Sequence, residues 1–561
     1  MIQSSGVAEI MEERGSKIHC AERLSWKGNL AVMLAIALLS FYLMSHWIWR
    51  PMSPDERNYL GWAMKLYKDG SYEDVEGRPI VKVPPLYVYS LALSFRTFGP
   101  STDAAQAVSL FFGCLGILLS YELGRRLWGW KVGLMASILL LVSAKGEYWR
   151  YSNRVLNEIP LGFFILCVVY FLCTYLRRPS WSKAAAVGSS LGLGLLTKEF
   201  AVLMLPVAGI TLVLARERWP KKLLHMLLAL SFLLLVLLPW LIHVTEITGS
   251  PLGGIAQRGR GQAGEIIKDT KAWGIRPIED WADMLTLYDR PAWLCQVAMI
   301  AGMAYAMWRF LRKREPEMGI LVLPMLVFLG TFGLFVALPL DLRRLVPLFP
   351  LYSLLVAILL KRIWEFFVEK AQRLNLRTLA SMKLGVALFI LFALNSLKPG
   401  LVMHKFEPFR IFSSRKDFFL LSESEAAMRC VPSNSTILTN YPSILYFYLQ
   451  GNYPIRTLRT TMETPNPPLL SDMAGLGRMQ SLEGDSLLYD FQFMRKRVVM
   501  TREFLRRQIE ASGADYLIFF RTGHPKAAPR VLEEFFMEHP DEYAPVCLEE
   551  RYAVYRIVRS R

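Results

Sequence analysis

Long apolar blocks constrain the fold of this chain more than any other feature of its sequence. The first block runs from Leu30 to Trp49, and several later blocks approach the ~20 residues that a helix needs to cross a ~30 Å hydrocarbon core. Such a block is helical in lipid, because each backbone N–H and C=O must find its partner within the segment. The mean hydropathy of +0.29 is also high for a soluble protein. The sequence therefore predicts a polytopic α-helical membrane protein.

The apolar pattern predicts about eleven spans. Their expected ranges are 29–49, 103–123, 131–145, 157–176, 184–198, 200–215, 222–243, 291–310, 318–340, 344–360 and 383–401. A further stretch, Leu86–Phe98, is short enough to be a re-entrant or interfacial helix. The first block resembles a signal peptide, but it is too long and lacks a small-residue cleavage site, so we expect a retained span.

Basic residues between the spans predict the orientation of the chain. Lys and Arg gather in alternate short loops, at 125–131, 177–183, 216–222, 309–317 and 361–377. Cytoplasmic loops carry such an excess, so these loops and the basic segment 1–28 are expected in the cytoplasm. The outer side of the cell membrane then receives the loops 50–102 and 244–290 and everything after about 402. The basic residues of the cytoplasmic loops, which set the topology and contact anionic lipids, explain the net charge of +18. This charge therefore does not imply nucleic-acid binding.

Residues 403–561 have a different pattern from the apolar region 29–402. Short runs rich in β-branched and aromatic residues alternate with helix-like polar stretches, which predicts a small extracytoplasmic α/β domain. The last run, 545–558, reads as two strands joined by a turn. Cys430 and Cys547 also fall here, and they are candidates for a disulfide if the domain is extracytoplasmic, although the sequence does not fix the pairing.

Charged residues recur where the outer loops meet the membrane. The acids are Asp55, Glu56 and Glu158, and the bases are Lys82, Arg154, Lys198, Arg343 and Arg344. For any one of them, a solvated or snorkelling helix end is a sufficient explanation. Together, however, four outer turns each pair a base with an acid on the side where bases are disfavoured. This distribution indicates an anion held at the lipid surface, such as a lipid phosphate, beside acids suited to proton transfer or metal binding.

At these residues the sequence resembles the GT-C superfamily of polytopic glycosyltransferases. It is most similar to dolichyl-phosphate-mannose protein mannosyltransferases and their bacterial relatives, which include the transferase that adds aminoarabinose to lipid A. The resemblance covers about the first 350 residues and rests on a series of segments. They are SPDERNYLGWAMKLYKDG, KVPPLYVYSLALSFRTFGPS, RVLNEIP, GLGLLTKEF and LRRLVPLFP. It implies transfer of a sugar from a polyprenyl-phosphate donor to a hydroxyl of a protein, lipid or glycan on the outer face.

The resemblance also implies roles for individual residues. The first-loop carboxylate of the family falls on Asp55, which becomes the candidate general base with Glu56 beside it. Capping of a helix that starts near Glu56 is the alternative role for Asp55. The family's basic residue before the prolines falls nearest Lys82, although Val83 intervenes, and the second-loop acid falls on Glu158. The remaining bases are candidates to hold the donor phosphate.

Three further expectations remain open at this stage. Glu158, His46 and His243 are candidate ligands of a divalent metal cation, although a structural role is the alternative for the two histidines, and the cysteines show no metal-ligand spacing. The glycine-rich segment 248–264, with Arg258 and Arg260, is either a flexible linker or a lid over the donor. A transporter or flippase for an anionic lipid-linked solute is the alternative function, but it would favour ionisable groups at mid-membrane and related halves. A non-catalytic scaffold would leave the charge clusters unexplained.

Overall fold

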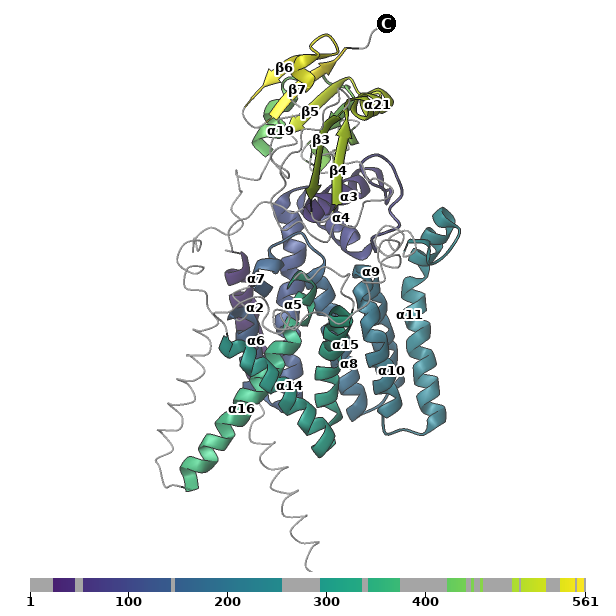
Figure 1. Cartoon of the computed structure of the whole chain (residues 1–561). Coiled ribbons are helices and arrows are strands. Elements are labelled where there is room, and N and C mark those ends of the chain that lie inside the picture. Colours follow the sequence, from purple (N-terminus) through teal and green to yellow (C-terminus); the bar gives the residue numbers. More distant parts are fainter. Residues whose placement is uncertain are drawn as a thin grey trace, which may run out of the picture. The chain divides into compact units, whose positions relative to one another are not determined.

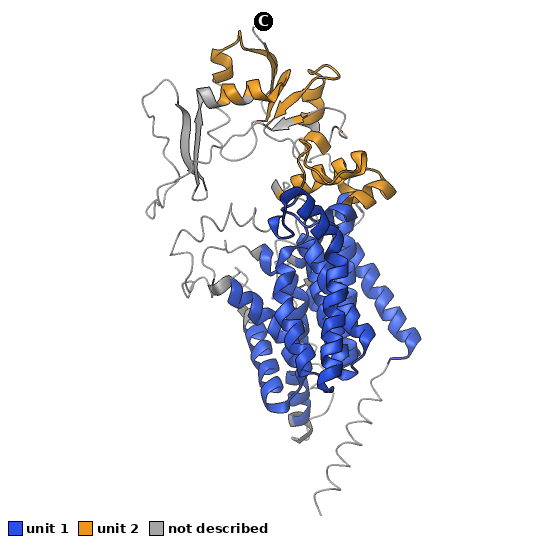
Figure 2. Ribbon diagram, turned by 90° about the vertical axis from the view of Figure 1, so that its right-hand side faces the viewer, with its two compact units in different colours: residues 1–49, 81–90, 105–413 blue, residues 50–80, 91–104, 414–561 orange. Residues whose placement is uncertain are grey.

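The computed structural model describes most of the chain. The described residues are 24–45, 54–142, 147–254, 293–334, 342–373, 421–439, 445–447, 449, 455–457, 487–493, 496–520, 535–549 and 552–558. They form two compact units, coloured blue and orange in Figure 2. Unit 1 comprises residues 1–49, 81–90 and 105–413, and unit 2 comprises 50–80, 91–104 and 414–561. This division differs from the expected one at residue 402, because two pieces of the first outer loop belong with the C-terminal residues.

Unit 1 is built from helices (Figure 1). Its helices are α2 (Trp26–Ser45), α6 (Trp130–Val142), α7 (Glu147–Ser152), α8 (Glu158–Arg177), α9 (Trp181–Thr197), α10 (Met204–Leu214), α11 (Trp219–Thr248), α14 (Trp293–Lys313), α15 (Pro316–Leu334) and α16 (Phe349–Arg373), with the 3-10 helices η2 (Glu199–Leu203) and η5 (Leu342–Leu348). Two more helices, α4 (Leu86–Phe98) and α5 (Thr102–Trp128), are divided between the units.

Five described helical stretches are long and apolar enough to cross a membrane. They are Trp26–Leu43, Thr102–Trp128, Glu158–Arg177, Trp219–Thr248 and Arg343–Glu369. Helices occupy the other expected spans as well, with the exception of 383–401, which lies outside the described residues. The total of about eleven spans stays a prediction.

Close backbone contacts and basic side chains hold the helices of unit 1 together. Gly188 on α9 leaves room for the carbonyl oxygen of Ala229 on α11, where a Cβ atom would collide with it. The end of α5 is fixed differently. Arg177 donates to the carbonyl oxygen of Arg126 at 2.8 Å, and Lys361 donates to that of Trp128 at 2.9 Å. The last carbonyls of a helix have no partner within it, so side chains from α8 and α16 satisfy them here.

Unit 2 contains a five-stranded mixed sheet in the order β2-β1-β5-β7-β6. Its strands are β1 (Ile437–Thr439), β2 (Ile455–Thr457), β5 (Tyr516–Phe520), β6 (Tyr543–Leu548) and β7 (Tyr552–Ile557). β2, β1 and β5 are parallel, whereas β5, β7 and β6 pair antiparallel, which confirms the two strands predicted at 545–558. The remaining elements of its C-terminal part are the antiparallel pair β3 (Leu487–Phe493) and β4 (Lys496–Thr501) and the helices α19 (Leu421–Met428) and α21 (Arg502–Ser512).

The core of this sheet is aromatic and aliphatic. Leu505 and Ile509 on α21 pack with Leu517 and Phe519 on β5 and with Tyr555 on β7, and all five are buried. Leu517 and Phe519 are two positions apart, so they share one face of β5, and Leu505 and Ile509 are four positions apart, so they share one face of α21.

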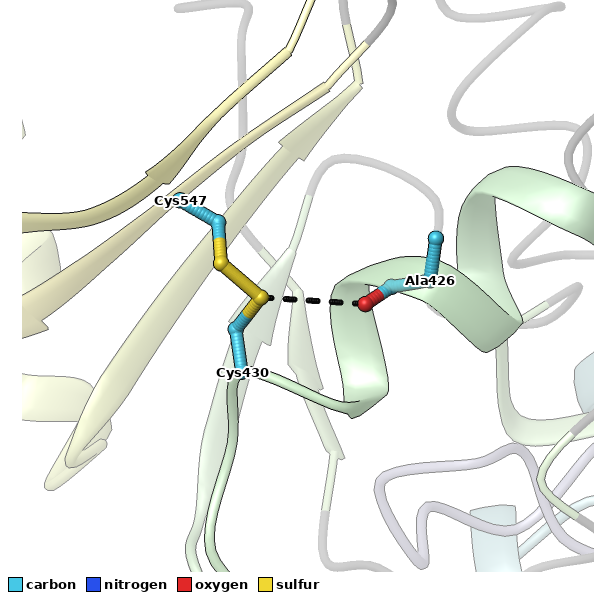
Figure 3. The surroundings of a disulfide bond; sticks show 3 residues. All are labelled: Ala426, Cys430 and Cys547. Atoms are coloured by element: carbon cyan, nitrogen blue, oxygen red, sulfur yellow. Dashed lines mark hydrogen bonds between the residues drawn. A yellow bond between two sulfur atoms is a disulfide. The ribbon is translucent and has the colours of Figure 1, made fainter.

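A disulfide joins Cys430 and Cys547 in unit 2, with their Cα atoms 6.4 Å apart (Figure 3). Cys430 follows α19, where its sulfur lies 3.7 Å from the carbonyl oxygen of Ala426. Cys547 lies on β6, which is one of the two edge strands of the sheet. The covalent bond therefore ties this edge to a segment 117 residues earlier in the chain.

The first-loop pieces of unit 2 pack on its C-terminal residues. Phe447 contacts Phe95 on α4 with ring centroids 5.7 Å apart, and both rings are buried. On α3 (Pro54–Asp69), Lys65 pairs with Asp69 at 2.5 Å. Burial lowers the pKa of Lys65, but the hydrogen bond with Asp69 and the nearby Tyr446 leave it above its usual value. Residues 445–447 thus connect the sheet region with α3 and α4.

Candidate active site

Glu158 is the centre of a buried charge cluster in unit 1. It lies in the first turn of α8 and is 1% exposed. Its Oε1 atom accepts a hydrogen bond from Nζ of Lys198 at 2.7 Å and lies 3.1 Å from Nε of Arg343. The structure therefore brings together three residues that the sequence analysis took from three different outer turns.

A glycine allows η5, which carries Arg343, to approach α8. Gly162 lies one helical turn after Glu158, so the two residues share a face of α8. A Cβ atom at position 162 would lie 3.0 Å from Cα and 3.2 Å from the carbonyl oxygen of Pro347 on η5. Close packing at this glycine therefore sets the separation between Arg343 and Glu158.

Asn157 links the ends of α8 and α9. It occupies the N-cap position of α8, but its side chain makes no capping hydrogen bond there. Its amide Nδ2 instead donates to the carbonyl oxygen of Thr197 at 3.0 Å, at the last residue of α9. A side-chain cap stabilises a helix by ~1 kcal/mol, and Asn157 forgoes this contribution for a bond between helices.

Phe200 places a second guanidinium beside the cluster. Nζ of Lys198 lies 5.8 Å from the centroid of this ring, and the guanidinium of Arg344 lies 5.6 Å from it. Cations within about 6 Å of an aromatic ring are attracted to its face. Phe200, on η2, thus holds Lys198 and Arg344 at one ring.

These four charged residues, Glu158, Lys198, Arg343 and Arg344, are called the Glu158 cluster below. It contains one carboxylate and three bases, so its sum is positive. The other oxygen of Glu158, Oε2, is buried and accepts no hydrogen bond from the described part of the chain. Lysine and arginine side chains bind anions through charge-assisted hydrogen bonds. The cluster therefore has the chemistry to hold an anion and also to accept a hydrogen bond from a group attached to it.

Asp55 and Glu56 belong to unit 2. They lie in the first turn of α3, where Glu56 is 4% exposed and Asp55 is half-buried. The helix begins at Pro54, so Asp55 lies within its first turn, and its capping role stays a prediction. Negative charge in this turn is favoured by the dipole of the helix.

The remaining predicted bases, Lys82 and Arg154, also belong to unit 1. Lys82 is exposed in the segment before α4. Arg154 is 6% exposed, and its guanidinium lies 5.1 Å from the ring centroid of Tyr151. Their role in holding a phosphate stays a prediction.

The expectations about a metal and a lid stay predictions too. His243 stacks on Trp240, with ring centroids 5.4 Å apart. His46, Arg258 and Arg260 lie outside the described residues. Within the described ranges, no group of three or more His, Cys, Asp or Glu side chains is arranged to hold a metal ion.

Comparisons with known proteins identify the class of enzyme. Residues 82–243 match the family model described as dolichyl-phosphate-mannose-protein mannosyltransferase. The undecaprenyl phosphate-α-4-amino-4-deoxy-L-arabinose arabinosyl transferase of Pseudomonas paraeruginosa is 27% identical over 400 residues, which is 68% of each chain. These similarities support a polyprenyl-phosphate-sugar-dependent glycosyltransferase of the GT-C type.

Solved structures show the same fold at low identity. ArnT of Cupriavidus metallidurans, in a crystal structure bound to undecaprenyl phosphate, gives a TM-score of 0.59 at 13% identity, covering 96% of this chain and 99% of that one. The oligosaccharyltransferase of Archaeoglobus fulgidus, tethered to an acceptor peptide, gives 0.57 at 12% identity, covering 95% and 74%. This likeness supports the predicted GT-C type of fold, and the similarity to named transferases favours an enzyme over a transporter or flippase.

The sequence did not predict the uncharged residues that help to assemble the Glu158 cluster. Asn157, Gly162 and Phe200 carry no charge, so a search for ionisable groups in outer turns passes over them. Two of them nonetheless lie beside the charged residues in sequence, since Asn157 precedes Glu158 and Phe200 follows Lys198 by two positions. Their positions next to charged residues are the sequence feature that could have indicated them.

Proposed function

We propose that this GT-C enzyme moves a sugar from a polyprenyl-phosphate donor to a hydroxyl of a protein, lipid or glycan on the outer face of the cell membrane. The observation that carries the proposal is the Glu158 cluster, in which three bases lie around one carboxylate whose Oε2 atom accepts no hydrogen bond from the described residues. The names of the family model and of the relatives support the class of donor.

The bases of the cluster hold the donor phosphate in this proposal. Arg343 and Arg344 present guanidinium groups, which match phosphate oxygens in a bidentate manner, and Lys198 adds a compact charge. Because they lie in a largely buried site, their attraction for phosphate is stronger than it would be in water. Lys82 and Arg154 are further candidates for the same anion.

Asp55 acts as the general base. The acceptor oxygen attacks the anomeric carbon, and the bond from this carbon to the phosphate oxygen breaks with its electron pair leaving on the phosphate. The acceptor proton passes to Asp55, and Glu56 flanks the base. One displacement of this kind inverts the anomeric configuration. The enzyme has to position the acceptor and to stabilise the departing phosphate, because the donor already carries a good leaving group.

Glu158 has two roles in this scheme. Its Oε1 atom orients Lys198 and Arg343, and its Oε2 atom accepts a hydrogen bond from a hydroxyl or amino group of the sugar. The Glu158 cluster thus contacts both the phosphate and the sugar of the donor.

The disulfide supports the proposed topology. Disulfides persist in oxidising compartments and are rare in the cytosol. A bond between Cys430 and Cys547 therefore favours an extracytoplasmic position for residues 403–561, with the N-terminus in the cytoplasm. Alkylation of the unreduced protein in intact cells tests this, because two free thiols at these positions would contradict it.

Transfer of a labelled sugar tests the function. Membranes that contain the protein are supplied with undecaprenyl phosphate carrying radiolabelled 4-amino-4-deoxy-L-arabinose or mannose, and label in the acceptor fraction is measured. We expect Asp55→Asn to bind donor but to lose transfer by at least about a hundredfold, as is typical for loss of general acid–base catalysis. Asp69→Asn is the matched control, because it removes a carboxylate from the other end of α3.

Two results would contradict the proposal. Full transfer by Asp55→Asn would remove Asp55 as the base. Absence of both binding and transfer with either donor would reject these two polyprenyl-phosphate sugars. A titration with a chelator in the same assay tests the divalent cation.

A further inference from the structure

Asn157 and Glu158 are adjacent in sequence, and so are Thr197 and Lys198. Two hydrogen bonds join the first pair, at the start of α8, to the second pair, at the end of α9. Asn157 Nδ2 donates to the Thr197 carbonyl oxygen at 3.0 Å, and Lys198 Nζ donates to Glu158 Oε1 at 2.7 Å. One bond of this link is neutral and the other is ionic, and all four residues are buried.

The backbone at Lys198 explains why such a link is needed. The N–H of Lys198 still donates to the carbonyl oxygen of Gly194 at 2.9 Å, but the residue itself is extended, with φ −162° and ψ 138°. The 3-10 helix η2 begins at the next residue. The lysine side chain therefore departs from a junction between two helices. The bond from Asn157 ends at the residue immediately before Lys198, so it fixes this junction against α8.

We propose that Asn157 is a positioning residue, which holds Lys198 against Glu158 in the geometry that grips the donor phosphate. The inference rests on the proposed function for the role of the phosphate, but the link between the helices can be tested without any donor. Asn157 itself need not touch the substrate. It acts through Lys198, whose Nζ its bond helps to place.

A purely structural role is the alternative. In that case the amide of Asn157 only satisfies a carbonyl at the end of α9, and its loss lowers the amount of folded protein without changing donor binding by the folded fraction. The two roles therefore differ in donor affinity per folded molecule and in the coupling between Glu158 and Lys198.

Asn157→Ser is the most informative variant. Serine is a favoured N-cap residue, so it suits the start of α8, but it is too short to reach Thr197. The dissociation constant of undecaprenyl phosphate is measured on the folded protein in detergent for Asn157→Ser, for Lys198→Met and for the double variant. We expect Asn157→Ser to weaken binding about tenfold, since misplacement of a gripping group carries a cost of this order or more.

The double variant decides whether Asn157 acts through Lys198. If it does, Asn157→Ser adds little once Lys198 is replaced by methionine, so the double variant binds no more weakly than Lys198→Met alone. An additive loss in the double variant would overturn the inference. Asn29→Ser is the control. Asn29 also makes a hydrogen bond between helices, with Tyr121 at 2.8 Å, and we expect its replacement to leave binding unchanged.

A second measurement separates this inference from the proposed function. The coupling between Glu158 and Lys198 is obtained from a double-mutant cycle on the unfolding equilibrium, once in the native background and once in the Asn157→Ser background. A smaller coupling in the Asn157→Ser background supports the positioning role, and an unchanged coupling overturns it. If the coupling falls but Lys198→Met binds undecaprenyl phosphate normally, the phosphate role of Lys198 fails and the positioning role stands.

Discussion

Removal of the disulfide should destabilise the sheet of unit 2 by an amount that follows from the chain length it spans. The bond between Cys430 and Cys547 closes a loop with a sequence separation of 117 residues. Closing a loop of this length removes about 16 cal/mol/K of entropy from the unfolded chain, which is about 4.9 kcal/mol at 25 °C. The double variant Cys430→Ala/Cys547→Ala should lose up to this amount.

Hydrogen exchange measures the loss in the full-length protein. Exchange at the central strands β5 and β7 follows the opening of the sheet, and about 1.4 kcal/mol corresponds to each tenfold change. We expect amides in both strands to exchange up to about 3,000-fold faster in the double variant. Amides in α8 and α9, which belong to unit 1, should be much less affected.

The single variants provide a strict control. Either substitution alone breaks the same bond, so Cys430→Ala and Cys547→Ala should each accelerate exchange as much as both together. Cys167→Ser, which removes a thiol that forms no disulfide, should have little effect on the sheet. Additive effects of the two single variants, or a change below about tenfold in the double variant, would refute the reasoning.

Three further predictions concern individual side chains. Glu158→Gln should destabilise unit 1 by about 3 kcal/mol, because it leaves buried cations without their carboxylate; thermal unfolding in detergent measures this, and an unchanged melting temperature would contradict it. Gly162→Ala should lower the stability of the fold by about 1–3 kcal/mol and weaken donor binding, because the added Cβ would press on Pro347. Gly209→Ala is the control, since a Cβ there would meet nothing within 4 Å, and its melting temperature should be unchanged or higher. Burial, with a contribution from a neighbouring carboxylate, raises the pKa of Tyr543 from 10.0 to about 12. The neutral phenol of Tyr543 therefore contributes fully to the stability of the sheet below pH 10, and this stability falls as the pH rises from 10 to about 12. In an alkaline unfolding series, Tyr543→Phe should make that fall smaller.

Much of the fold could be predicted, because long apolar runs leave a chain in lipid few choices. The predicted stretch Leu86–Phe98 coincides with α4, and the range 157–176 nearly coincides with α8. The strands β6 and β7 followed from their aromatic and β-branched residues around a polar turn. The pair β3 and β4 was not predicted, although Tyr489, Phe491 and Phe493 alternate with polar residues in the pattern that marks a strand with one buried face.

The charged residues of the candidate site could be predicted from the sequence, but the contacts between them could not. Charge in an outer turn is visible in a sequence, so Glu158, Lys198 and Arg343 could be named. The choice of Arg343 as the ion-pair partner of Glu158 depends on the 3-10 turns of η5 and on the approach at Gly162, which are tertiary features. The association of α3 with residues 445–447 also depends on contacts between segments far apart in sequence, and no local pattern indicates it.

The composition of unit 2 has a consequence for how this protein is made. Its early segment, which carries Asp55, leaves the ribosome long before the strands that complete the same unit. Roughly 330 residues separate Ile80 from Ser414, which is about half a minute of synthesis at ~10 residues per second. During that interval the ring of Phe95 lacks Phe447, one of its final partners, so an early part of the chain is among the last to reach its native environment. A premature stop just before residue 414 would leave every predicted active-site residue synthesised and yet deprive Asp55 and Glu56 of the rest of their unit.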